Sequence, residues 1–272
     1  MDVARPGRVA WEAGDGQSYL YHGDCIDIMK EMPAGSVDCV WTDPPYKLSN
    51  DGVTCVGGRM VSVNKGSWDR SGGHEVDHLF NVAWLEACHR LLKPNGTIWV
   101  SGTLHAYFSI GFAMQQLGYR ILNDIVWEKP APPPNLGCRC FTHATELLIW
   151  ATKARKGGGR YTFNYTTMKE ENGGKQMKNV WRLPAVSKGE KRHGKHPTQK
   201  PLGVVARSLR ASTSPGDLVF DPFAGSSTTG VAALGLGRRF IGCETQRRYV
   251  SLSVKRLSDL KDVESRLLPA SG

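Results

Sequence analysis

Residues 217–230 read DLVFDPFAGSSTTG, and this stretch decides the fold class. Its first seven residues form an apolar run that predicts a buried strand, and the small residues after it predict a tight turn into a helix. Small residues let the backbone approach a ligand closely, and a helix N-terminus offers free N–H groups to a carboxylate or a phosphate. The stretch has neither a G-x-G-x-x-G pattern nor the Gly-Lys-Ser of a P-loop, which disfavours both of those nucleotide sites. A tight turn without a ligand is the alternative.

Strand-like and helix-like stretches alternate on both sides of this turn, which is typical of an α/β layer fold. Seven strands are predicted, at 18–24, 36–43, 96–102, 121–129, 145–153, 217–223 and 238–244. Helices are predicted at 25–32, 78–92, 106–118, 200–212, 226–237 and 249–260. We therefore expect a mostly parallel seven-stranded sheet flanked by helices.

Two irregular regions interrupt this pattern. Residues 47–77 are rich in glycine, and a loop of roughly 30 residues in a compact domain is often a lid or a binding loop. Residues 154–195 are polar and basic, and they hold too little apolar material for a core of their own. We expect one domain over residues 18–258, with inserted loops at 47–77 and 154–195 and with tails at 1–17 and 259–272.

The composition points to a polyanionic partner. The chain has 272 residues, a net charge of +10 and a pI near 9.3, and nucleic acid is the simplest partner for such an excess of positive charge. A basic protein without such a partner is the alternative. Hydrophobic residues make up 40% and charged residues 22% of the chain, which excludes a largely disordered protein.

Membrane, disulfide and metal signals are weak. No run reaches the roughly 20 apolar residues of a membrane span, and residues 1–16 hold no apolar signal core, so we expect a cytoplasmic protein without a membrane partner. Seven scattered cysteines predict reduced thiols rather than a disulfide framework. Cys138, Cys140 and His143 form the only cluster that could suggest zinc, and because no second pair accompanies them we expect no metal.

The tetrapeptide Asp43-Pro44-Pro45-Tyr46 ends the predicted strand 36–43. In an open parallel sheet, ligands bind outside the carboxyl ends of the strands. The two prolines remove two N–H donors, which leaves carbonyls and the Asp43 carboxylate as acceptors beside the Tyr46 ring. Acceptors beside a flat ring suit a planar group with an exocyclic NH2. A proline turn with Asp43 as a cap is the alternative.

Two more features accompany the tetrapeptide. Glu244 ends the strand 238–244, where an acid can accept both hydroxyls of a ribose, although a surface glutamate would give the same sequence. Residues 194–201 read GKHPTQKP, a basic tract that runs into a proline able to start a helix. Taken alone, this tract is more typical of a helix start with solvated charges than of a site.

Together, these features resemble the amino-methylating DNA methyltransferases, which use S-adenosylmethionine. Residues 43–46 resemble their D/N/S-P-P-Y/F motif, residues 221–230 resemble their F-x-G-x-G motif, and HPTQKP resembles the motif before it. The catalytic motif comes first in the chain, as in the β class. Ser227 departs from the family pattern, which has a second glycine there, and we expect the cofactor still to fit.

The likeness covers roughly residues 18 to 258 and is nearest to the DpnA-like enzymes, the accessory GATC adenine methylases of two-methylase restriction systems. The stretches that carry it are DPPYKLSNDG, VSVNKGSWD, NLGCRCFTHATELLIWATK, NGGKQMKNVW and GKHPTQKP. The resemblance implies the class I methyltransferase fold, which is Rossmann-like.

The resemblance also implies a role for each matching residue. The cofactor would be bound by Asp24, Cys25, Asp43, Thr198, Lys200, Asp221, Phe223, Gly225, Ser227, Thr228 and Glu244. In this set, Asp24 and the Cys25 backbone would hold the adenine of the cofactor, and Glu244 would hold its ribose. Asp221, Phe223, Gly225 and Thr228 would line the methionine part, and Thr198 and Lys200 would help to fix that end.

The catalytic residues would be Asp43, Pro44, Pro45 and Tyr46. Asp43 and the Pro44 carbonyl would accept hydrogen bonds from the target amino group, and Tyr46 would stack on the flipped base. The proposed geometry frees the nitrogen lone pair, so that catalysis is mostly positioning and electrostatics.

DNA contacts are expected from the two irregular regions, because their positive charges suit phosphates. The predicted contacts are Lys65, Trp68, Lys153, Arg155, Lys156, Arg160, Lys191, Arg192 and Lys195. A solvated charge, or local packing for Trp68, is the alternative at each position.

We therefore predict a site-specific DNA methyltransferase that modifies the N6 amino group of adenine, within GATC, on duplex DNA and also on single strands. The resemblance further implies a cognate restriction endonuclease as a partner and a homodimer. Three alternatives stay open: a cytosine-N4 enzyme, in which serine is commoner at position 43; an RNA or protein-glutamine methylase, in which asparagine is usual there; and a nucleic-acid-binding module without activity. Asp24, Asp43, Tyr46 and Glu244 argue against the last.

Overall fold

The computed structural model describes residues 8–47, 53–56, 59–62, 66, 69–154 and 160–260. These residues form eleven strands: β1 Arg8–Glu12, β2 Tyr19–His22, β3 Val37–Thr42, β4 Val53–Val56, β5 Arg59–Ser62, β6 Leu92–Gly102, β7 Arg120–Glu128, β8 Thr145–Thr152, β9 Val180–Arg182, β10 Leu218–Asp221 and β11 Arg239–Glu244. The helices are α1 Cys25–Glu31, α2 His74–Leu91, α3 Leu104–Gln116, α4 Tyr165–Glu171, α5 Leu202–Ser212, α6 Thr228–Gly235 and α7 Arg247–Ser258, with a 3-10 turn η2 at Gly189–Lys191.

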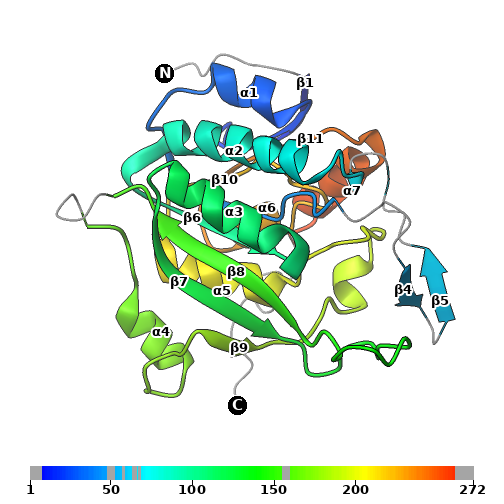
Figure 1. Ribbon diagram of the computed structural model, residues 1–272. Coiled ribbons are helices and arrows are strands. Elements are labelled where there is room, and N and C mark those ends of the chain that lie inside the picture. The colour runs from blue at the N-terminus through cyan, green and yellow to red at the C-terminus, as the bar shows by residue number, and fades with distance from the viewer. Residues whose placement is uncertain are drawn as a thin grey trace.

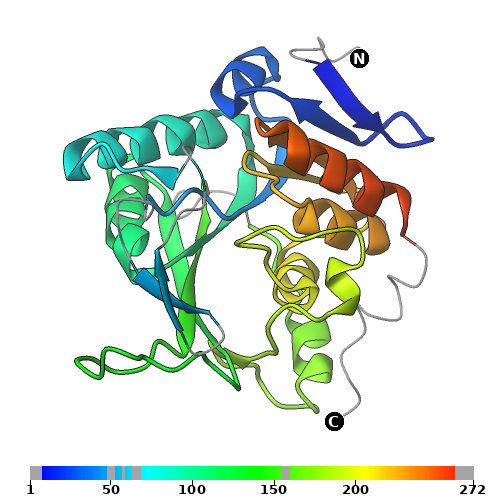
Figure 2. The same ribbon diagram turned by 90° about the vertical axis from the view of Figure 1, so that its right-hand side faces the viewer.

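One twisted sheet of nine strands forms the centre of the molecule, in the order β1-β2-β11-β10-β3-β6-β8-β7-β9 (Figure 1). Apolar side chains of α1, α2 and α3 pack on one face of the sheet, and those of α5, α6 and α7 pack on the other. Figure 2 shows α2 and α3 on the opposite side of the sheet from α5 and α7. The strand β3 is buried almost along its length because helices cover both faces, which explains its continuous apolar pattern.

The strands β2, β11, β10, β3 and β6 run parallel, so their carboxyl ends share one edge of the sheet, here called the carboxyl edge. After β10 the chain crosses to β11 on one side, and after β3 it crosses to β6 on the other. The chain therefore changes winding direction between β10 and β3. Ligands of open α/β sheets bind in the crevice at such a point.

All seven predicted strands and all six predicted helices are present, but the sheet has two more strands than predicted. The strand β1 lies within residues 1–17, which we expected to be a tail, and it pairs antiparallel with β2. The strand β9 forms the other edge and pairs with β7. Both are short edge strands, and the register of β1 shifts between Val9 and Trp11, so neither leaves a clear alternating pattern.

The two inserted regions also contain more regular structure than the sequence predicts. The strands β4 and β5 form an antiparallel hairpin within residues 47–77. Residues 154–195 contain α4 and β9, and their side chains Met168 and Trp181 are buried in the main core. The second insertion is therefore packed onto the sheet. Among the described residues, no helix is both long and apolar enough to cross a membrane.

Close packing of α6 on β11 gives the first prediction. A Cβ atom added at Gly230 would lie 2.6 Å from Phe240 and 2.7 Å from Leu257, whereas one added at Gly203, in the first turn of α5, would meet nothing within 4 Å. Gly230→Ala should lower the free energy of unfolding by about 1–3 kcal/mol through overpacking. Gly203→Ala should leave it unchanged or raise it by about 0.5–1 kcal/mol. Urea unfolding of both variants tests this, and equal stabilities would contradict the packing.

Candidate active site

A cavity opens at the carboxyl edge, where several chain segments meet. It lies beside the ends of β2, β3, β10 and β11. Seven of the predicted cofactor residues line it, namely Asp24, Cys25, Asp43, Thr198, Phe223, Gly225 and Glu244. Residues more than 200 positions apart in the sequence thus come together at the predicted edge of the sheet.

Asp24 lies at the junction of β2 and α1. Its backbone is extended, and its side chain accepts a hydrogen bond of 2.8 Å from the N–H of Ile26, so it caps the N-terminus of α1. Cys25 begins the helix and is buried, and burial raises the pKa of its thiol to about 12. The thiol is therefore neutral, and the Asp24 carboxylate supplies the negative charge at this end of the cavity.

Glu244 ends β11, the strand that pairs with β2. Its Oε2 accepts a hydrogen bond of 3.0 Å from the N–H of Gly225, and its Oε1 accepts one of 2.6 Å from the N–H of Gln246. Burial raises the pKa of this carboxyl to about 7. Each carboxylate oxygen keeps a further lone pair, so the group can accept hydrogen bonds from a ligand as well.

Asp221, at the end of β10, does not line this cavity. Its carboxylate accepts hydrogen bonds from the Thr42 hydroxyl at 3.0 Å, the Phe223 N–H at 3.0 Å and the Thr229 hydroxyl at 2.6 Å. Burial raises its pKa to about 7. Asp221 therefore ties β10 to β3 and to α6, which is a structural role that the sequence did not predict.

A smaller cavity adjoins the first and shares Asp43, His196, Thr198, Phe223 and Gly225 with it. Lys200, Asp221 and Thr228, predicted to contact the cofactor, line only this smaller cavity. Ser227 lines neither cavity and is fully buried. Its φ is +53°, in the left-handed region where glycine is favoured, which is the physical reason for the glycine of the family pattern.

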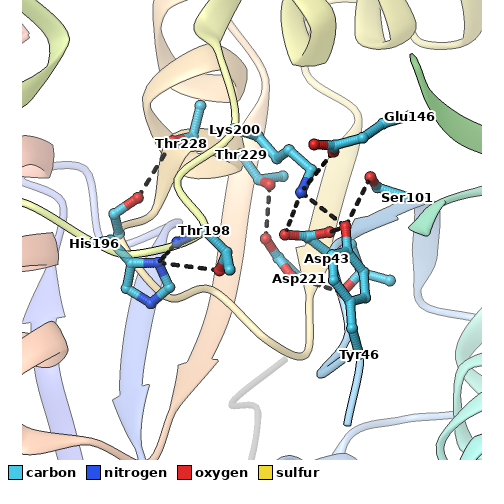
Figure 3. A network of polar contacts seen from close by, with 12 residues as sticks. Asp43, Tyr46, Ser101, Glu146, His196, Thr198, Lys200, Asp221, Thr228 and Thr229 are labelled. Atoms are coloured by element: carbon cyan, nitrogen blue, oxygen red, sulfur yellow. Dashed lines mark hydrogen bonds and ion pairs between the residues drawn. The ribbon is translucent and has the colours of Figure 1, made fainter. Parts of the chain in front are cut away.

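The Asp43 carboxylate is the centre of a polar network in the closest view of the site (Figure 3). Its Oδ2 accepts a hydrogen bond of 2.7 Å from the Lys200 ammonium, and its Oδ1 accepts one from the Tyr46 hydroxyl. The Lys200 ammonium is thus bound to the catalytic motif, and its predicted contact with the cofactor stays a prediction. Burial raises the pKa of Asp43, and the charge of Lys200 opposes that rise.

Tyr46 is only 6% exposed, and its hydroxyl also accepts a hydrogen bond of 2.8 Å from Lys200 and lies 3.4 Å from Ser101 Oγ. Burial and the neighbouring Asp43 charge raise its pKa well above the ordinary value. Its ring packs in the core beneath the cavity in this conformation. Stacking of Tyr46 on a base stays a prediction that requires the ring to come free.

The predicted DNA contacts separate into three groups. Lys65, Trp68, Arg155 and Lys156 lie outside the described residues. Lys191, Arg192 and Lys195 lie in the segment that leads to His196 on the wall of the cavity. All three residues are exposed, and Arg192 forms an ion pair of 2.8 Å with Asp259.

Lys153 directly follows β8, and Arg160 precedes Tyr161, whose ring lies 5.3 Å from the guanidinium of Arg120 at the start of β7. β8 ends where Thr152 pairs with Thr97 of β6, and the Lys153 N–H donates to the Gly96 carbonyl at 3.1 Å, so Lys153 lies away from the carboxyl edge. Its ammonium donates a hydrogen bond of 2.9 Å to the Leu92 carbonyl, and burial lowers its pKa. The positions of Lys153 and Arg160 therefore add no support to their predicted DNA contacts, which stay predictions. Sequence alone could not show this, because β8 runs antiparallel to its neighbour β6.

Glu146 is a site residue that the sequence analysis missed. It lies at the start of β8, and its carboxylate forms ion pairs with Lys200 at 3.2 Å and with Lys129 at 2.5 Å. Burial would raise its pKa, but the two lysine charges lower it below the ordinary value. An acid in an otherwise apolar strand was the available signal. Lys47 and Phe80 also line the cavity without having been predicted.

The cluster of Cys138, Cys140 and His143 lies in the loop between β7 and β8. Both cysteines are free and exposed. Across the described part of the chain, no three His, Cys, Asp or Glu side chains are placed to hold a metal ion.

The carboxyl-edge cavity, the acceptor motif after β3 and the sheet order together define a methyltransferase of the α/β class. Comparison with known proteins agrees. The chain is 49% identical over 238 residues to the Type II methyltransferase M2.DpnII of Streptococcus pneumoniae, a match that covers 88% of each chain. It is 46% identical over 253 residues to the Type II methyltransferase M2.MboI of Moraxella bovis, covering 93% of this chain and 92% of the relative.

Among solved structures, the M1.HpyAVI–SAM complex matches with a TM-score of 0.64 and 25% identity, over 88% of this chain and 98% of that one. The model of the N6/N4 DNA methylase family matches residues 37–255. The chain belongs to this DNA methylase family. The predicted enzyme class, a site-specific DNA methyltransferase with S-adenosylmethionine as its cofactor, is thus confirmed.

Ser227 gives the second prediction. A left-handed conformation costs a non-glycine residue about 1–2 kcal/mol, and the buried Ser227 Oγ has no hydrogen-bond partner among the described residues. Ser227→Gly should therefore raise the free energy of unfolding by about 1–2 kcal/mol in urea unfolding. Ser226→Gly is the matched control, because Ser226 is buried beside it without a positive φ, and it should not stabilise the protein. Destabilisation by Ser227→Gly would contradict the strain.

Proposed function

We propose that the protein transfers a methyl group to the N6 amino group of adenine in DNA, within GATC. The observation that carries the proposal is the position of Asp43, an acceptor whose side chain is 13% exposed and lines both the large cavity and the smaller one beside it. Similarity to two Type II methyltransferases over most of the chain supports a role in modification of a specific site. We further propose that residues 18–258 act together with the strand β1 as one methyltransferase domain.

The large cavity fits S-adenosylmethionine in its chemistry. Carboxylates of Asp24 and Glu244 face apolar groups of Ile26 and Phe223, an arrangement suited to a nucleoside with hydroxyls and a flat base. Asp24 and the Cys25 backbone would hold the adenine, and Glu244 would accept the ribose hydroxyls. When bound, S-adenosylmethionine supplies an electrophilic methyl group carried on a sulfonium.

The catalytic motif would act by holding the target amino group. An aromatic amine is a weak nucleophile because its lone pair is delocalised into the ring. Asp43 and the Pro44 carbonyl would each accept one N–H hydrogen bond, which orients the nitrogen and frees its lone pair toward the methyl group. The target base must leave the DNA stack to reach this motif, at a cost of a few kcal/mol.

Several finer statements about partners belong to the same proposal. Activity on single strands is expected because the cost of unstacking is lower there. A cognate restriction endonuclease and a homodimer are proposed from the family resemblance. Co-purification with a nuclease expressed from the same plasmid and light scattering of the purified protein test these two partners, and a monomer without a bound nuclease would remove both.

The third prediction concerns the product and Asp43. Duplex and single-stranded GATC oligonucleotides incubated with S-adenosylmethionine should yield N6-methyladenine in nucleoside mass spectrometry. Asp43→Ala should lower the rate by about 100- to 1,000-fold, because one positioned acceptor is lost, while DNA and cofactor affinities change little. N4-methylcytosine without N6-methyladenine would reverse the base assignment. Full activity of Asp43→Ala would remove Asp43 from the mechanism.

The fourth prediction concerns Glu244 and pH. Ribose hydroxyls prefer the ionised carboxylate as acceptor, and burial raises the pKa of Glu244 to about 7. Affinity for S-adenosylmethionine should therefore fall as the pH drops below about 7 and level off above it. Calorimetry should find weaker binding for Glu244→Ala, since two charge-assisted hydrogen bonds of about 1.5–3 kcal/mol each are lost. Glu244→Gln should not show this loss of affinity at low pH. A loss of affinity at low pH that persists in Glu244→Gln would show that another group causes it.

The fifth prediction compares the two basic stretches. Lys191→Gln with Lys195→Gln should weaken DNA binding and reduce its dependence on salt, because fewer counterions are released. The matched pair Lys153→Gln with Arg160→Gln should alter neither. Fluorescence anisotropy titrations from low to high salt give, for each variant, the slope of log DNA affinity against log salt concentration. A reduced slope only in the second pair would place the DNA along Lys153 and Arg160.

A further inference from the structure

Four charged side chains form a continuous chain from β7 to the catalytic motif. Lys129 pairs with Glu146 at 2.5 Å, Glu146 pairs with Lys200 at 3.2 Å, and Lys200 pairs with Asp43 at 2.7 Å. Their side chains range from 7% to 21% exposed. Two positive and two negative charges cancel, so the chain is neutral as a unit.

Lys200 is the fixed point of this chain. Its ammonium donates hydrogen bonds to Asp43 Oδ2 at 2.7 Å and to the Tyr46 hydroxyl at 2.8 Å, and it forms an ion pair of 3.2 Å with Glu146 Oε2, which accepts no hydrogen bond within the described residues (Figure 3). Burial alone would lower the pKa of Lys200, but the charges of Asp43 and Glu146 raise it well above the ordinary value. Lys200 is thus a permanent cation held on three sides.

Glu146 is held on two sides in turn. It comes from β8, which begins at the carboxyl edge because β8 runs antiparallel to β6. Its second lysine, Lys129, follows β7 and lies over the Trp127 ring at 5.1 Å. Glu146 is therefore anchored in the sheet and presents one oxygen to Lys200.

We propose that Glu146 and Lys200 are positioning residues for methyl transfer: Lys200 holds one oxygen of Asp43, and Glu146 holds Lys200 in place. The Asp43 carboxylate then meets the target amino group as an oriented, ionised acceptor. This inference rests on the proposed role of Asp43, and it assigns to Lys200 a function at the target amine rather than at the cofactor.

The groups that face Asp43 act on its ionisation in opposite directions. The positive charge of Lys200 favours the carboxylate, whereas the negative charge of Glu146 favours the protonated form. Asp221, behind the motif on β10, also repels the Asp43 charge, and the Tyr46 hydroxyl donates a hydrogen bond to it. Removing Lys200 and removing the Glu146 charge should therefore shift the titration of Asp43 in opposite directions.

The test is the pH dependence of the single-turnover methylation rate with saturating DNA and cofactor. Lys200→Met should lower the methylation rate at neutral pH by about 100-fold. The fall of the rate at low pH, here called the acid limb, should begin at a higher pH in this variant. Lys200→Arg keeps the charge and should restore the position of the limb. Glu146→Gln, which keeps the shape, should move the limb to lower pH with a smaller loss of rate.

Controls separate positioning from a merely structural role. Affinity for S-adenosylmethionine, measured by calorimetry, should stay within about twofold in all three variants. Glu128→Gln is the matched control, because Glu128 ends β7 and pairs with the exposed Arg182 at 3.7 Å, and it should leave the limb in place. If Lys200→Met does not fold, the direction of the Glu146→Gln shift still decides.

The proposal would be overturned if the acid limbs of Lys200→Met and Glu146→Gln stay where the wild-type limb lies, or if both move in the same direction. A tenfold loss of cofactor affinity in Lys200→Met would return Lys200 to the cofactor site. Failure of the proposed function looks different, because Asp43→Ala would then keep its activity. An inactive Asp43→Ala with wild-type pH profiles in the Lys200 and Glu146 variants would remove the positioning pair alone.

Discussion

Burial of the Asp43 charge is the constraint on which the active site depends. A carboxylate that loses its water pays several kcal/mol unless other groups replace the lost hydrogen bonds and balance the charge. Here the Lys200 ammonium and the Tyr46 hydroxyl replace them. Lys200 is itself buried and needs its own counter-charge, which Glu146 provides. The acceptor of the reaction is therefore available only because segments far apart in the chain meet around it.

The sheet brings those segments together. The change of winding direction between β10 and β3 opens a crevice at the carboxyl edge, and Asp221 joins the two strands through the Thr42 and Thr229 hydroxyls. Glu244 joins β11 to the small-residue turn at Gly225. The same polar groups that line or surround the cavity thus also hold its walls. Substitutions at these positions should therefore be tested for their effect on the free energy of unfolding as well as on activity.

Much of this arrangement could be predicted from the sequence. Apolar runs that end in Asp43, Asp221 and Glu244 mark parallel strands, and their carboxyl ends must share an edge. The motifs then fix the methyltransferase family. The direction of each strand in the sheet was harder to predict. The apolar pattern of β8, for example, is the same whether the strand runs parallel or antiparallel to β6. That direction moves Lys153 away from the site and brings Glu146 into it.

Side-chain partners could not be read from spacing either. Lys200 lies in a motif expected at the cofactor, and its contact with Asp43 depends on the path of the loop before α5. The inward turn of the Tyr46 ring depends in the same way on the core beneath it. The short strands β1 and β9 were missed because edge strands of a few residues leave little periodic signal.

Asp43 is an ionised acceptor in the folded protein if Lys200 holds it as inferred above. Carbon-13 NMR of aspartate carboxyl groups, with Asp43 assigned from the Asp43→Asn spectrum, measures this directly. The Asp43 resonance should show a carboxylate at neutral pH and should titrate at a higher pH than that of an exposed aspartate. A protonated Asp43 at neutral pH, or a titration unaffected by Lys200→Met, would contradict this inference.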